Sequence, residues 1–413
     1  MKILFVHQGF PGQYRHILRA LASQGIHQLV GMGIDTLKEP LPDGVHYIRY
    51  RLQRGNTLDA HPYVVETESK VIRGEACASA AAELKAKGFS PDLICVHPGW
   101  GESLFLKDIW PQTPLLSYQE FFYHPRGLDY DFDAELQGKP SWQDCAKLRM
   151  KNANLLLSLQ VSDWNVTPTL FQKSTFPLAF RPHISCIHDG IDTNLAAPDS
   201  LVPPMTLPDG VVIRRGESVV TFVNRCVEPY RGCHMFLRSL PRLQRLHPEA
   251  KVVIVGEQNG VSYGKNAPGG SWKTVFLKEL EGEIDFSRVH FTGSLPYSSF
   301  LQLLRITAAH VYLTYPFVLS WSLLEAMSSQ APVVGSATAP VQEVISDGVN
   351  GLLVDFFDSD QIADAVYELL MDTALSESLG LAARKTVQEK YSLNVCLPQQ
   401  LSLLELVAKR VLP

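Results

Sequence analysis

Short β-branched runs alternate with longer amphipathic stretches from one end of the chain to the other. Ile3–Val6 precedes a helical pattern over Gln13–Gln24, and the helix-like stretch Glu66–Lys87 precedes the apolar run Leu93–His97. Strands that alternate with helices in this way form a mostly parallel sheet with helices on both faces. The sequence therefore predicts an α/β protein. Further strands of the first sheet are expected at Leu115–Tyr118, Leu155–Leu159 and Ile184–His188.

A proline-rich stretch interrupts this alternation near the middle of the chain. Four prolines fall between Ala196 and Gly210, among few apolar residues that could anchor the segment. Proline at this density ends helices and sheet interiors, so the pattern predicts a linker or an irregular surface loop. The alternation then resumes, and strands of a second sheet are expected at Val219–Val223, Val252–Val255, Val289–Thr292, His310–Thr314 and Pro332–Gly335.

The length of 413 residues agrees with this division, because it exceeds that of most single domains. We expect one domain over residues 1–192, a linker over 193–215 and a second domain over 216–390. Residues 391–413 are expected to form a terminal helix that packs back on the first domain. Two open α/β sheets predict a ligand site in the cleft between them, lined by loops at the carboxyl ends of the strands.

Charge and cysteine content narrow the class of function. The formal net charge is −5, which argues against a nucleic-acid-binding protein. The seven cysteines include no closely spaced pair, which predicts reduced thiols in a cytoplasmic protein. No apolar run approaches the ~18 residues of a membrane helix. An acceptor at the inner membrane surface, met by peripheral contact, stays compatible with this composition.

A glycine-containing loop, His7–Tyr14, follows the first expected strand. Gly9 and Gly12 would let the backbone approach a ligand, and the helix that follows offers free N–H groups to an anion. The loop lacks the GxGxxG pattern of dinucleotide-binding proteins. A plain tight turn is the alternative interpretation.

Two arginines stand at the corresponding place in the second half of the chain. Arg225 lies at the end of the first strand of the second sheet, and Arg231 lies where the next helix opens. Two guanidinium groups at such a place suit a diphosphate. The alternative is a pair of solvated arginines.

A third segment, Tyr315–Met327, combines helix-capping serines with an acid. Ser320 or Ser322 caps the expected helix, and Glu325 falls in its first turn or two. A carboxylate there can accept two hydrogen bonds from a diol such as a ribose. An ordinary acid at the start of a helix is the alternative.

In their joint order these segments resemble the retaining glycosyltransferases of family 4, also called group 1. The resemblance rests on Glu325-Ala-Met, Ala331-Pro-Val-Val-Gly, Glu343-Val-Ile-Ser-Asp-Gly-Val-Asn-Gly, the arginine positions and the segment His188–Asp192. The N-terminal half resembles the bacterial subgroup with a family 4 type of N-terminal domain, through His7–Tyr14, Val96–Ser103 and Tyr118–Tyr123.

The resemblance implies the GT-B fold, in which two Rossmann-like domains face each other across a cleft. It implies a UDP-, GDP- or dTDP-sugar donor, neither metal nor cofactor, and a glycan, lipid-linked or small-molecule acceptor. Arg225 and Arg231 are then expected to neutralise the diphosphate, and Glu325 to bind the ribose. Gly9 and Gly12 are expected to approach the phosphates or the transferred sugar.

The sequence departs from the family pattern at Phe317, where the family has a first acid that contacts the donor sugar. Backbone N–H groups of Leu319, Ser320 and Trp321 are expected to face the donor instead. Weaker candidates are His97, which ends a strand, and Glu120, which follows the next; either would orient the acceptor hydroxyl. A last candidate is Tyr297, placed beside the nucleotide base.

Two other functions fit the same residues. One is a GT-B nucleotide-sugar epimerase, which isomerises its substrate instead of transferring a sugar. The other is a non-catalytic protein that binds a sugar nucleotide, which Phe317 suggests because it removes the family's first acid.

Overall fold

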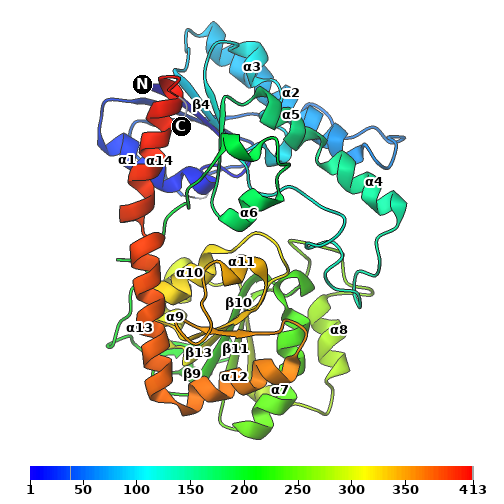
Figure 1. Ribbon diagram of the computed structural model, residues 1–413, viewed down its shortest axis with the longest axis vertical. Coiled ribbons are helices and arrows are strands. Elements are labelled where there is room, and N and C mark those ends of the chain that lie inside the picture. Colours follow the sequence, from blue (N-terminus) through cyan, green and yellow to red (C-terminus); the bar gives the residue numbers. More distant parts are fainter. Residues whose placement is uncertain (38, 412–413) are drawn as a thin grey trace. The chain divides into compact units, whose positions relative to one another are not determined.

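The computed structural model describes residues 1–37 and 39–411, which divide into two compact units. The first unit comprises Met1–Gly190 together with Cys396–Pro413, and the second comprises Ile191–Val395. Each unit is built on a parallel sheet of its own, flanked by helices (Figure 1).

The first unit contains a seven-stranded parallel sheet in the order β3-β2-β1-β4-β5-β6-β7. Its strand order reverses between β1 and β4, which is the topological switch point where open α/β sheets bind ligands. The strands are β1 (Lys2–Val6), β2 (Gln28–Gly33), β3 (Val45–Arg49), β4 (Leu93–Val96), β5 (Leu115–Tyr118), β6 (Trp164–Thr167) and β7 (Ile184–Cys186). The helices are η1 (Gly12–Tyr14), α1 (Arg15–Ser23), α2 (Val65–Ala86), η2 (Pro98–Trp100), α3 (Leu106–Ile109), α4 (Trp142–Lys151), α5 (Ala153–Val161), α6 (Leu170–Thr175), η3 (Arg181–His183) and α14 (Leu393–Ala408).

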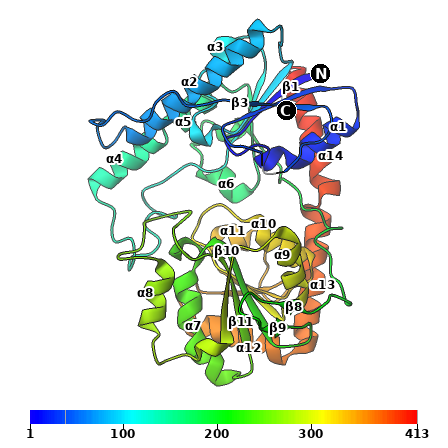
Figure 2. The ribbon, with the colours of Figure 1, turned by 180° about the vertical axis from the view of Figure 1, so that it is seen from behind.

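Both faces of this sheet are buried, because successive side chains of a strand point to opposite sides. Ile3 and Phe5 pack toward α1 and α14, whereas Leu4 and Val6 pack toward α2 and α3. Leu403, Leu404 and Val407 of α14 belong to the first of these cores. The C-terminal helix therefore lies beside α1, as both ribbon views show (Figure 2).

The second unit contains a six-stranded parallel sheet in the order β12-β11-β10-β13-β14-β15 and a separate two-stranded sheet, β8-β9. The switch point of the larger sheet lies between β10 and β13. The strands are β8 (Met205–Thr206), β9 (Val212–Ile213), β10 (Val219–Cys226), β11 (Lys251–Glu257), β12 (Val289–Gly293), β13 (Ala309–Tyr312), β14 (Val333–Ser336) and β15 (Leu352–Val354).

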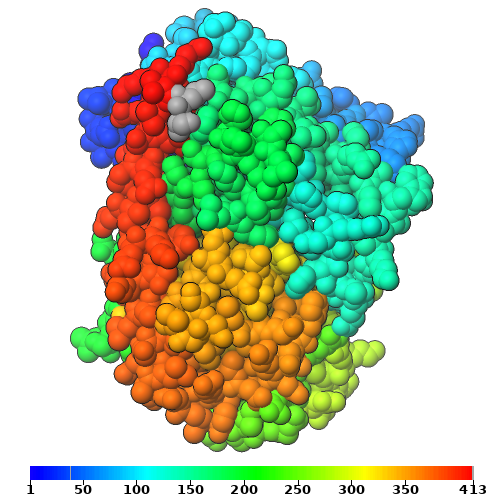
Figure 3. Space-filling model, in the orientation of Figure 1, coloured from blue at the N-terminus to red at the C-terminus, as the bar shows by residue number. Residues whose placement is uncertain are grey.

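Helices cover both faces of the larger sheet in the second unit. One face packs on α9, α10 and α13, and the other on α7 and α12, where the rings of Phe222 and Phe236 stack 4.6 Å apart. Helices α12 and α13 form part of the surface of this unit (Figure 3, orange). The helices are η4 (Pro229–Arg231), α7 (Cys233–Leu246), α8 (Trp272–Glu279), η5 (Phe286–Arg288), α9 (Tyr297–Ile306), α10 (Trp321–Ser328), α11 (Ala339–Gln342), α12 (Ser359–Met371) and α13 (Thr373–Lys390).

The proline-rich segment is more ordered than its composition predicts. Residues 193–215 lie within the second unit and contain the antiparallel pair β8-β9. Met205, Leu207 and Ile213 are buried in the core of that unit. The segment is anchored because these apolar side chains are interspersed among the prolines.

One expected strand is wrong. Leu155–Leu159 lies in helix α5, and the strand of this region is β6. A short buried apolar run cannot be assigned to helix or strand from its periodicity alone, and a leucine-rich run favours the helix.

Candidate functional site

The switch point of the first sheet brings two histidines together. His7 follows β1 and His97 follows the neighbouring strand β4, and their rings lie 5.1 Å apart. Both side chains are buried. Burial lowers the pKa of His7 to about 4 and holds the pKa of His97 well below its usual range, where the nearby His7 adds to the effect. Both imidazoles are therefore neutral at neutral pH.

A hydrogen bond fixes the tautomer of His97. Its Nδ1 accepts from the backbone N–H of Gly99 at 3.2 Å, so the ring proton is on Nε2. This Nε2 lies 3.8 Å from Oε2 of Glu120 and has no hydrogen-bond partner among the described residues. The side chain of Gln13 donates to Oε1 of Glu120 at 3.5 Å. The fold thus gathers His97, Glu120 and Gln13 at one edge of the sheet.

The two glycines of the first loop differ in what they permit. Gly12 has a φ of +50°, and a Cβ there would lie 2.4 Å from Nε2 of His7. The first neighbour of a Cβ at Gly9 would be Asp35 Oδ2 at 3.5 Å, an ordinary contact. Gly12 is therefore required for packing of the His7 ring, and its role toward a ligand stays a prediction, as does that of Gly9.

The switch point of the second sheet holds a buried arginine. Arg231 ends η4 and is 6% exposed. Its Nη1 donates to Thr314 Oγ1 at 2.8 Å, to the carbonyl of Val318 at 3.0 Å and to the hydroxyl of Tyr312 at 3.4 Å. All three acceptors are neutral, so the guanidinium keeps a desolvated positive charge.

The residue after Arg231 must be glycine. Gly232 has a φ of +72°, and a Cβ there would lie 2.4 Å from Cβ of Leu313. Gly232 therefore lets the chain turn from η4 into α7 directly beside the end of β13.

The other predicted arginine is placed differently. Arg225 is exposed on β10 and makes no hydrogen bond or ion pair with any residue that the structure describes. Glu228 lies between Arg225 and Arg231 in the sequence and is 1% exposed. Its carboxylate accepts hydrogen bonds from the backbone N–H groups of Ser262 and Tyr263. Burial raises the pKa of Glu228, while the two arginines oppose this rise.

Phe317, the departure from the family pattern, belongs to an aromatic cluster around Arg231. Its ring contacts those of Tyr230 and Tyr263, with centroids 5.6 and 4.9 Å away. The guanidinium carbon of Arg231 lies 5.3 Å from the Tyr263 ring centroid and 5.8 Å from that of Phe317. The faces of these rings provide weak electrostatic attraction for the buried cation.

One of the three backbone N–H groups expected to face the donor is engaged within the protein, and the roles of the other two, Leu319 and Trp321, stay predictions. The N–H of Ser320 donates to the hydroxyl of Tyr312 at 2.9 Å, so this amide already has an acceptor inside the protein. Leu319 is buried in the core, and Trp321 packs against it. Ser320 itself caps α10 by accepting from the N–H of Ser322.

Glu325 lies on α10 and is paired with another predicted residue. The hydroxyl of Tyr297, at the start of α9, donates to Oε1 of Glu325 at 2.6 Å. The structure thus brings Glu325 and Tyr297 together, although the sequence assigned them to different parts of a nucleotide. The hydrogen bond between Ser320 and Tyr312 in turn links α10 to the acceptors of Arg231.

Sequence reasoning did not find Glu228, Tyr263, Tyr312 or Thr314. The sequence contains a signal for three of the four. Glu228 is in the same loop as Arg225 and Arg231, and Tyr312 and Thr314 lie at the end of an expected strand. Tyr263 comes from the distant segment between β11 and α8, and no local signal marks it.

Two family models match the chain and together cover most of it. The model described as "Glycosyl transferase family 4 group" matches residues 26–196, and the model "Glycosyl transferases group 1" matches residues 207–386. The chain is a group 1 glycosyltransferase with a family 4 type of N-terminal domain.

Two of the curated relatives of this glycosyltransferase are named as enzymes of sugar transfer. A GDP-mannose-dependent α-(1-6)-phosphatidylinositol monomannoside mannosyltransferase of Mycolicibacterium smegmatis is 28% identical over 52% of this chain and 54% of its own length. The chain thus spans about half the length of that relative. A glycogen synthase of Mycobacterium tuberculosis is 25% identical over 95% of this chain and 91% of its own.

Solved structures show that this glycosyltransferase has the GT-B fold. A sucrose-phosphate synthase from Thermosynechococcus elongatus superposes with a TM-score of 0.70 at 17% identity, covering 98% of both chains. Anabaena HepE, solved in complex with UDP and glucose, superposes with a TM-score of 0.65 at 17% identity, covering 98% of this chain and 99% of that one.

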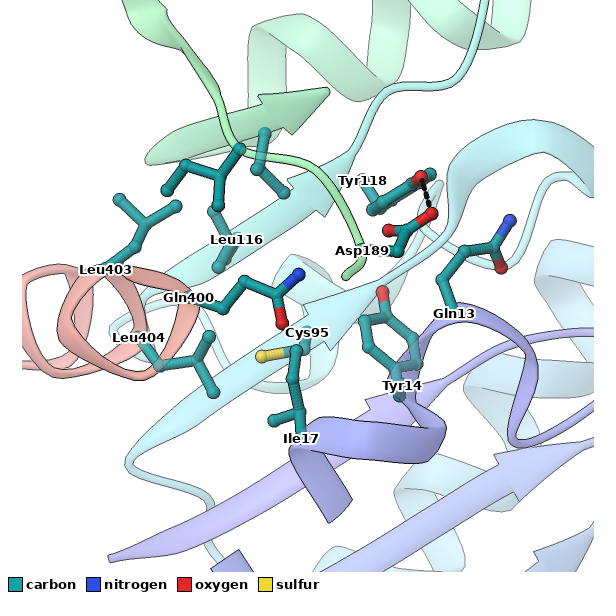
Figure 4. Close-up of a pocket in the computed structure, with 12 residues that line it drawn as sticks. Gln13, Tyr14, Ile17, Cys95, Leu116, Tyr118, Asp189, Gln400, Leu403 and Leu404 are labelled. Carbon is teal, nitrogen blue, oxygen red and sulfur yellow. Dashed lines mark hydrogen bonds between the residues drawn. The ribbon is translucent and has the colours of Figure 1, made fainter. Parts of the chain in front are cut away.

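Asp189, within the segment His188–Asp192 of this glycosyltransferase, lines a cavity of the first unit. The hydroxyl of Tyr118 donates to Asp189 Oδ2 at 3.0 Å, and the Gln400 side chain of α14 donates to the carbonyl of His188 at 2.7 Å. Figure 4 shows Tyr118 and Asp189 pointing toward one another at the wall of this cavity, whose other side is formed by leucines of α14. These contacts fix the segment to the first sheet.

None of the helices among the described residues is long and apolar enough to span a membrane. No group of three or more histidine, cysteine or acidic side chains in the described part of the chain is arranged to hold a metal ion.

Proposed function

We propose that this glycosyltransferase moves a sugar from a nucleotide-diphosphate donor to a hydroxyl of an acceptor, with retention of the anomeric configuration and without a metal. The observation that carries the proposal is the charge of Arg231, which is buried among neutral acceptors. The nearby carboxyl of Glu228 has its pKa raised by burial, so a bound diphosphate would supply the stronger counter-charge for this buried cation.

The donor diphosphate is assigned to the end of β10 and the start of α7. The exposed Arg225 and the buried Arg231 supply positive charge there. The leaving diphosphate gains negative charge as its bond to the sugar breaks, so fixed cations stabilise the transition state more than the ground state. In this scheme the two arginines do what a metal ion does in other transferases.

The nucleoside is assigned to Glu325 and Tyr297. A carboxylate accepts two hydrogen bonds from the ribose diol, and the Tyr297 hydroxyl holds the Glu325 side chain in place. The ring of Tyr297 is 44% exposed, which leaves surface for contact with the base.

The acceptor hydroxyl is assigned to His97 and Glu120. The Nε2–H of His97 can donate to this oxygen, while a carboxylate oxygen of Glu120 accepts its proton in a hydrogen bond. In the front-face route the bond from the anomeric carbon to the phosphate oxygen breaks and the bond to the acceptor oxygen forms on the same face. As the new bond forms, the acceptor proton leaves its hydrogen bond to Glu120 and passes to the departing phosphate oxygen.

A thermal-shift screen against UDP, GDP, dTDP and their common sugar conjugates tests the donor assignment, because a ligand that binds only the folded state raises Tm. GDP and UDP are both included because one relative is named as GDP-mannose-dependent and one similar structure was solved with UDP. We expect one nucleotide to raise Tm in the wild type and to lose this effect in Arg231→Ala. A screen in which no nucleotide raises Tm contradicts the proposal.

A second candidate, a non-catalytic sugar-nucleotide-binding protein, is favoured by Phe317, which is 5% exposed in the aromatic cluster at the place of the family's first acid. The two are separated by incubating the purified protein with donor, with and without acceptor. Nucleotide release that requires acceptor supports transfer. Donor binding without release supports the second candidate, and interconversion of donor epimers without acceptor indicates an epimerase.

A further inference from the structure

The first unit contains a second cavity, whose walls are polar. Its empty space is about 370 Å³, open solvent at its mouth included, and it is lined by residues of α2, the end of α4, α5 and the segments after β4 and β5. Its polar lining includes Lys70, His97, Glu120, Tyr123, Lys151 and Asn154.

Two lysines from different helices face this cavity. Lys70 is on α2 and Lys151 is the last residue of α4. The ammonium of Lys151 lies 3.9 Å from the centroid of the Tyr123 ring, and no carboxylate of the described residues lies within 4.0 Å of it. Lys70 is 3.9 Å from a carboxylate oxygen of Glu66, which is itself 58% exposed and so largely solvated.

The two ammonium groups repel one another. Burial lowers the pKa of Lys70 and the charges of Lys151 and Arg73 lower it further, whereas Glu66 and the buried Glu102 oppose this. Holding like charges near a partly buried cavity is unfavourable unless an anion binds between them. Only one exposed carboxylate, that of Glu66, forms an ion pair with either lysine among the described residues.

A third donor points into the same cavity. His97 is 2% exposed, and its Nε2–H has no hydrogen-bond partner among the described residues. An unpaired buried donor is costly, and an oxygen atom of a ligand would satisfy it. The cavity therefore offers two cations and one neutral N–H group, together with the carboxylate of Glu120.

The walls that carry these groups are held by side-chain to backbone hydrogen bonds. The Asn154 amide donates to the carbonyl of Pro98 at 3.0 Å. The Asn152 side chain both accepts from the N–H of Tyr123 at 3.0 Å and donates to its carbonyl at 2.7 Å. The positions of the Tyr123 backbone and the η2 turn are thus fixed in advance, which lowers the entropic cost of binding.

We propose that this cavity binds an anionic group, a phosphate or carboxylate, of a hydroxyl-bearing acceptor, with Lys70 and Lys151 as the specificity-determining residues. The inference rests on the proposed function, since it gives the acceptor its chemical class. The lysines bind the anion, and His97 and Glu120 hold the hydroxyl that receives the sugar.

The first test is titration calorimetry of the full chain with inorganic phosphate and with sn-glycerol 3-phosphate. The variant Lys70→Gln/Lys151→Gln should bind both at least about tenfold more weakly, because charge-assisted hydrogen bonds are lost. Lys151→Gln alone, which changes only the lysine at the end of α4, should show a smaller loss and guards against misfolding of the double variant. Lys147→Gln, an exposed lysine on α4, is the matched control and should bind as the wild type does.

The same titrations separate this inference from the donor assignment. Arg231→Ala should keep its affinity for both probes, while it loses nucleotide binding. Phosphate affinity that falls in Arg231→Ala and not in the lysine variants overturns the inference, because the anion is then bound in the second unit. Equal affinity of wild type and double variant, or no measurable binding of either probe by the wild type, also overturns it.

The source of the anion is resolved by a third measurement. Vesicles containing phosphatidic acid are sedimented with the protein, with and without competing sn-glycerol 3-phosphate. Lysine-dependent sedimentation indicates a lipid headgroup, whereas lysine-dependent binding of the soluble probe alone indicates a free phosphorylated acceptor. Neutral glycerol should bind neither the wild type nor the variants measurably.

Discussion

The two units place different chemistry at the same position of similar sheets. In each, the strand order reverses next to the first strand, between β1 and β4 in one unit and between β10 and β13 in the other. The first switch point holds two neutral histidines beside Glu120. The second holds the permanently charged Arg231 among neutral acceptors and aromatic rings.

This difference follows from how each group responds to burial. An imidazole loses its charge when it is desolvated, so it remains in the protein as a neutral donor and acceptor. A guanidinium cannot lose its charge at any ordinary pH, so it keeps an unmet attraction for an anion. The comparison teaches that burial leaves a neutral hydrogen-bonding group in the first unit and a fixed positive charge in the second, which is the basis of the proposed acceptor and diphosphate assignments.

The largest expected effect concerns the neutral histidines. The pKa of His7 is lowered from 6.5 to about 4 by burial, so between these values the unfolded chain binds more protons than the folded one. The stabilisation is complete above pH 6.5 and is lost as the pH falls toward 4, at up to about 1.4 kcal/mol per pH unit. Urea unfolding of the wild type and His7→Gln across this window measures the difference in slope. The exposed His61→Gln is the control, and equal slopes in wild type and His7→Gln would show that His7 is not buried as a neutral group.

The second effect concerns the buried cation. Arg231→Ala should weaken binding of the matching nucleoside diphosphate by ~1.5–3 kcal/mol, about 10- to 150-fold, because charge-assisted hydrogen bonds to the diphosphate are lost. Calorimetric titration gives the affinity. Arg242→Ala on α7 removes an arginine paired with Asp364 at the surface and should leave the affinity unchanged. Similar losses in both variants would mean that the effect is one of net charge.

The third effect compares glycines at the two switch points. Gly232→Ala and Gly12→Ala each place a Cβ 2.4 Å from a neighbour at a positive φ, so both should lower the free energy of unfolding by about 1–3 kcal/mol. Gly9→Ala makes only an ordinary contact and serves as the control. Chemical denaturation measures all three, and an unchanged stability of Gly232→Ala would contradict the tight turn beside Leu313.

The smallest effect concerns the pairing of Tyr297 with Glu325. Tyr297→Phe removes one hydrogen bond and should weaken nucleotide binding by about 0.5–1.5 kcal/mol. Glu325→Ala should weaken it more, since the ribose then loses its acceptor. The ratio of affinities for nucleoside and deoxynucleoside diphosphates should fall toward one only in Glu325→Ala. A Tyr297→Phe loss equal to that of Glu325→Ala would assign the direct contact to Tyr297.

The strand–helix alternation predicted both sheets. A buried parallel strand is a short continuous apolar run, and the helical stretches on either side of it in the sequence show where it begins and ends. It failed for Leu155–Leu159, where a helix buries an equally apolar run. The prolines of residues 193–215 led to the prediction of a linker or irregular loop, although Met205, Leu207 and Ile213 anchor that segment in the core. The local pattern alone does not show whether packing will favour a helix or a strand in the first case, or a loop or a buried segment in the second.

The site was predictable to the extent that its residues end strands. His97, Glu120, Arg225 and Arg231 follow expected strands, and parallel strands bring their carboxyl ends to one edge of a sheet. Their states were not predictable. The tautomer of His97 depends on the Gly99 amide, and the acceptors of Arg231 come from residues about eighty positions away.

By itself, the sequence determined the fold class, the family and the residues at the strand ends, since these depend on periodicity and on the order of motifs along the chain. Only the tertiary structure decided that Arg231 is buried while Arg225 is exposed, that the Ser320 amide is already engaged, and that Lys70 and Lys151 share a cavity. The physical reason is that charge, burial and hydrogen-bond availability depend on groups that are distant in sequence and become neighbours only when the sheets form.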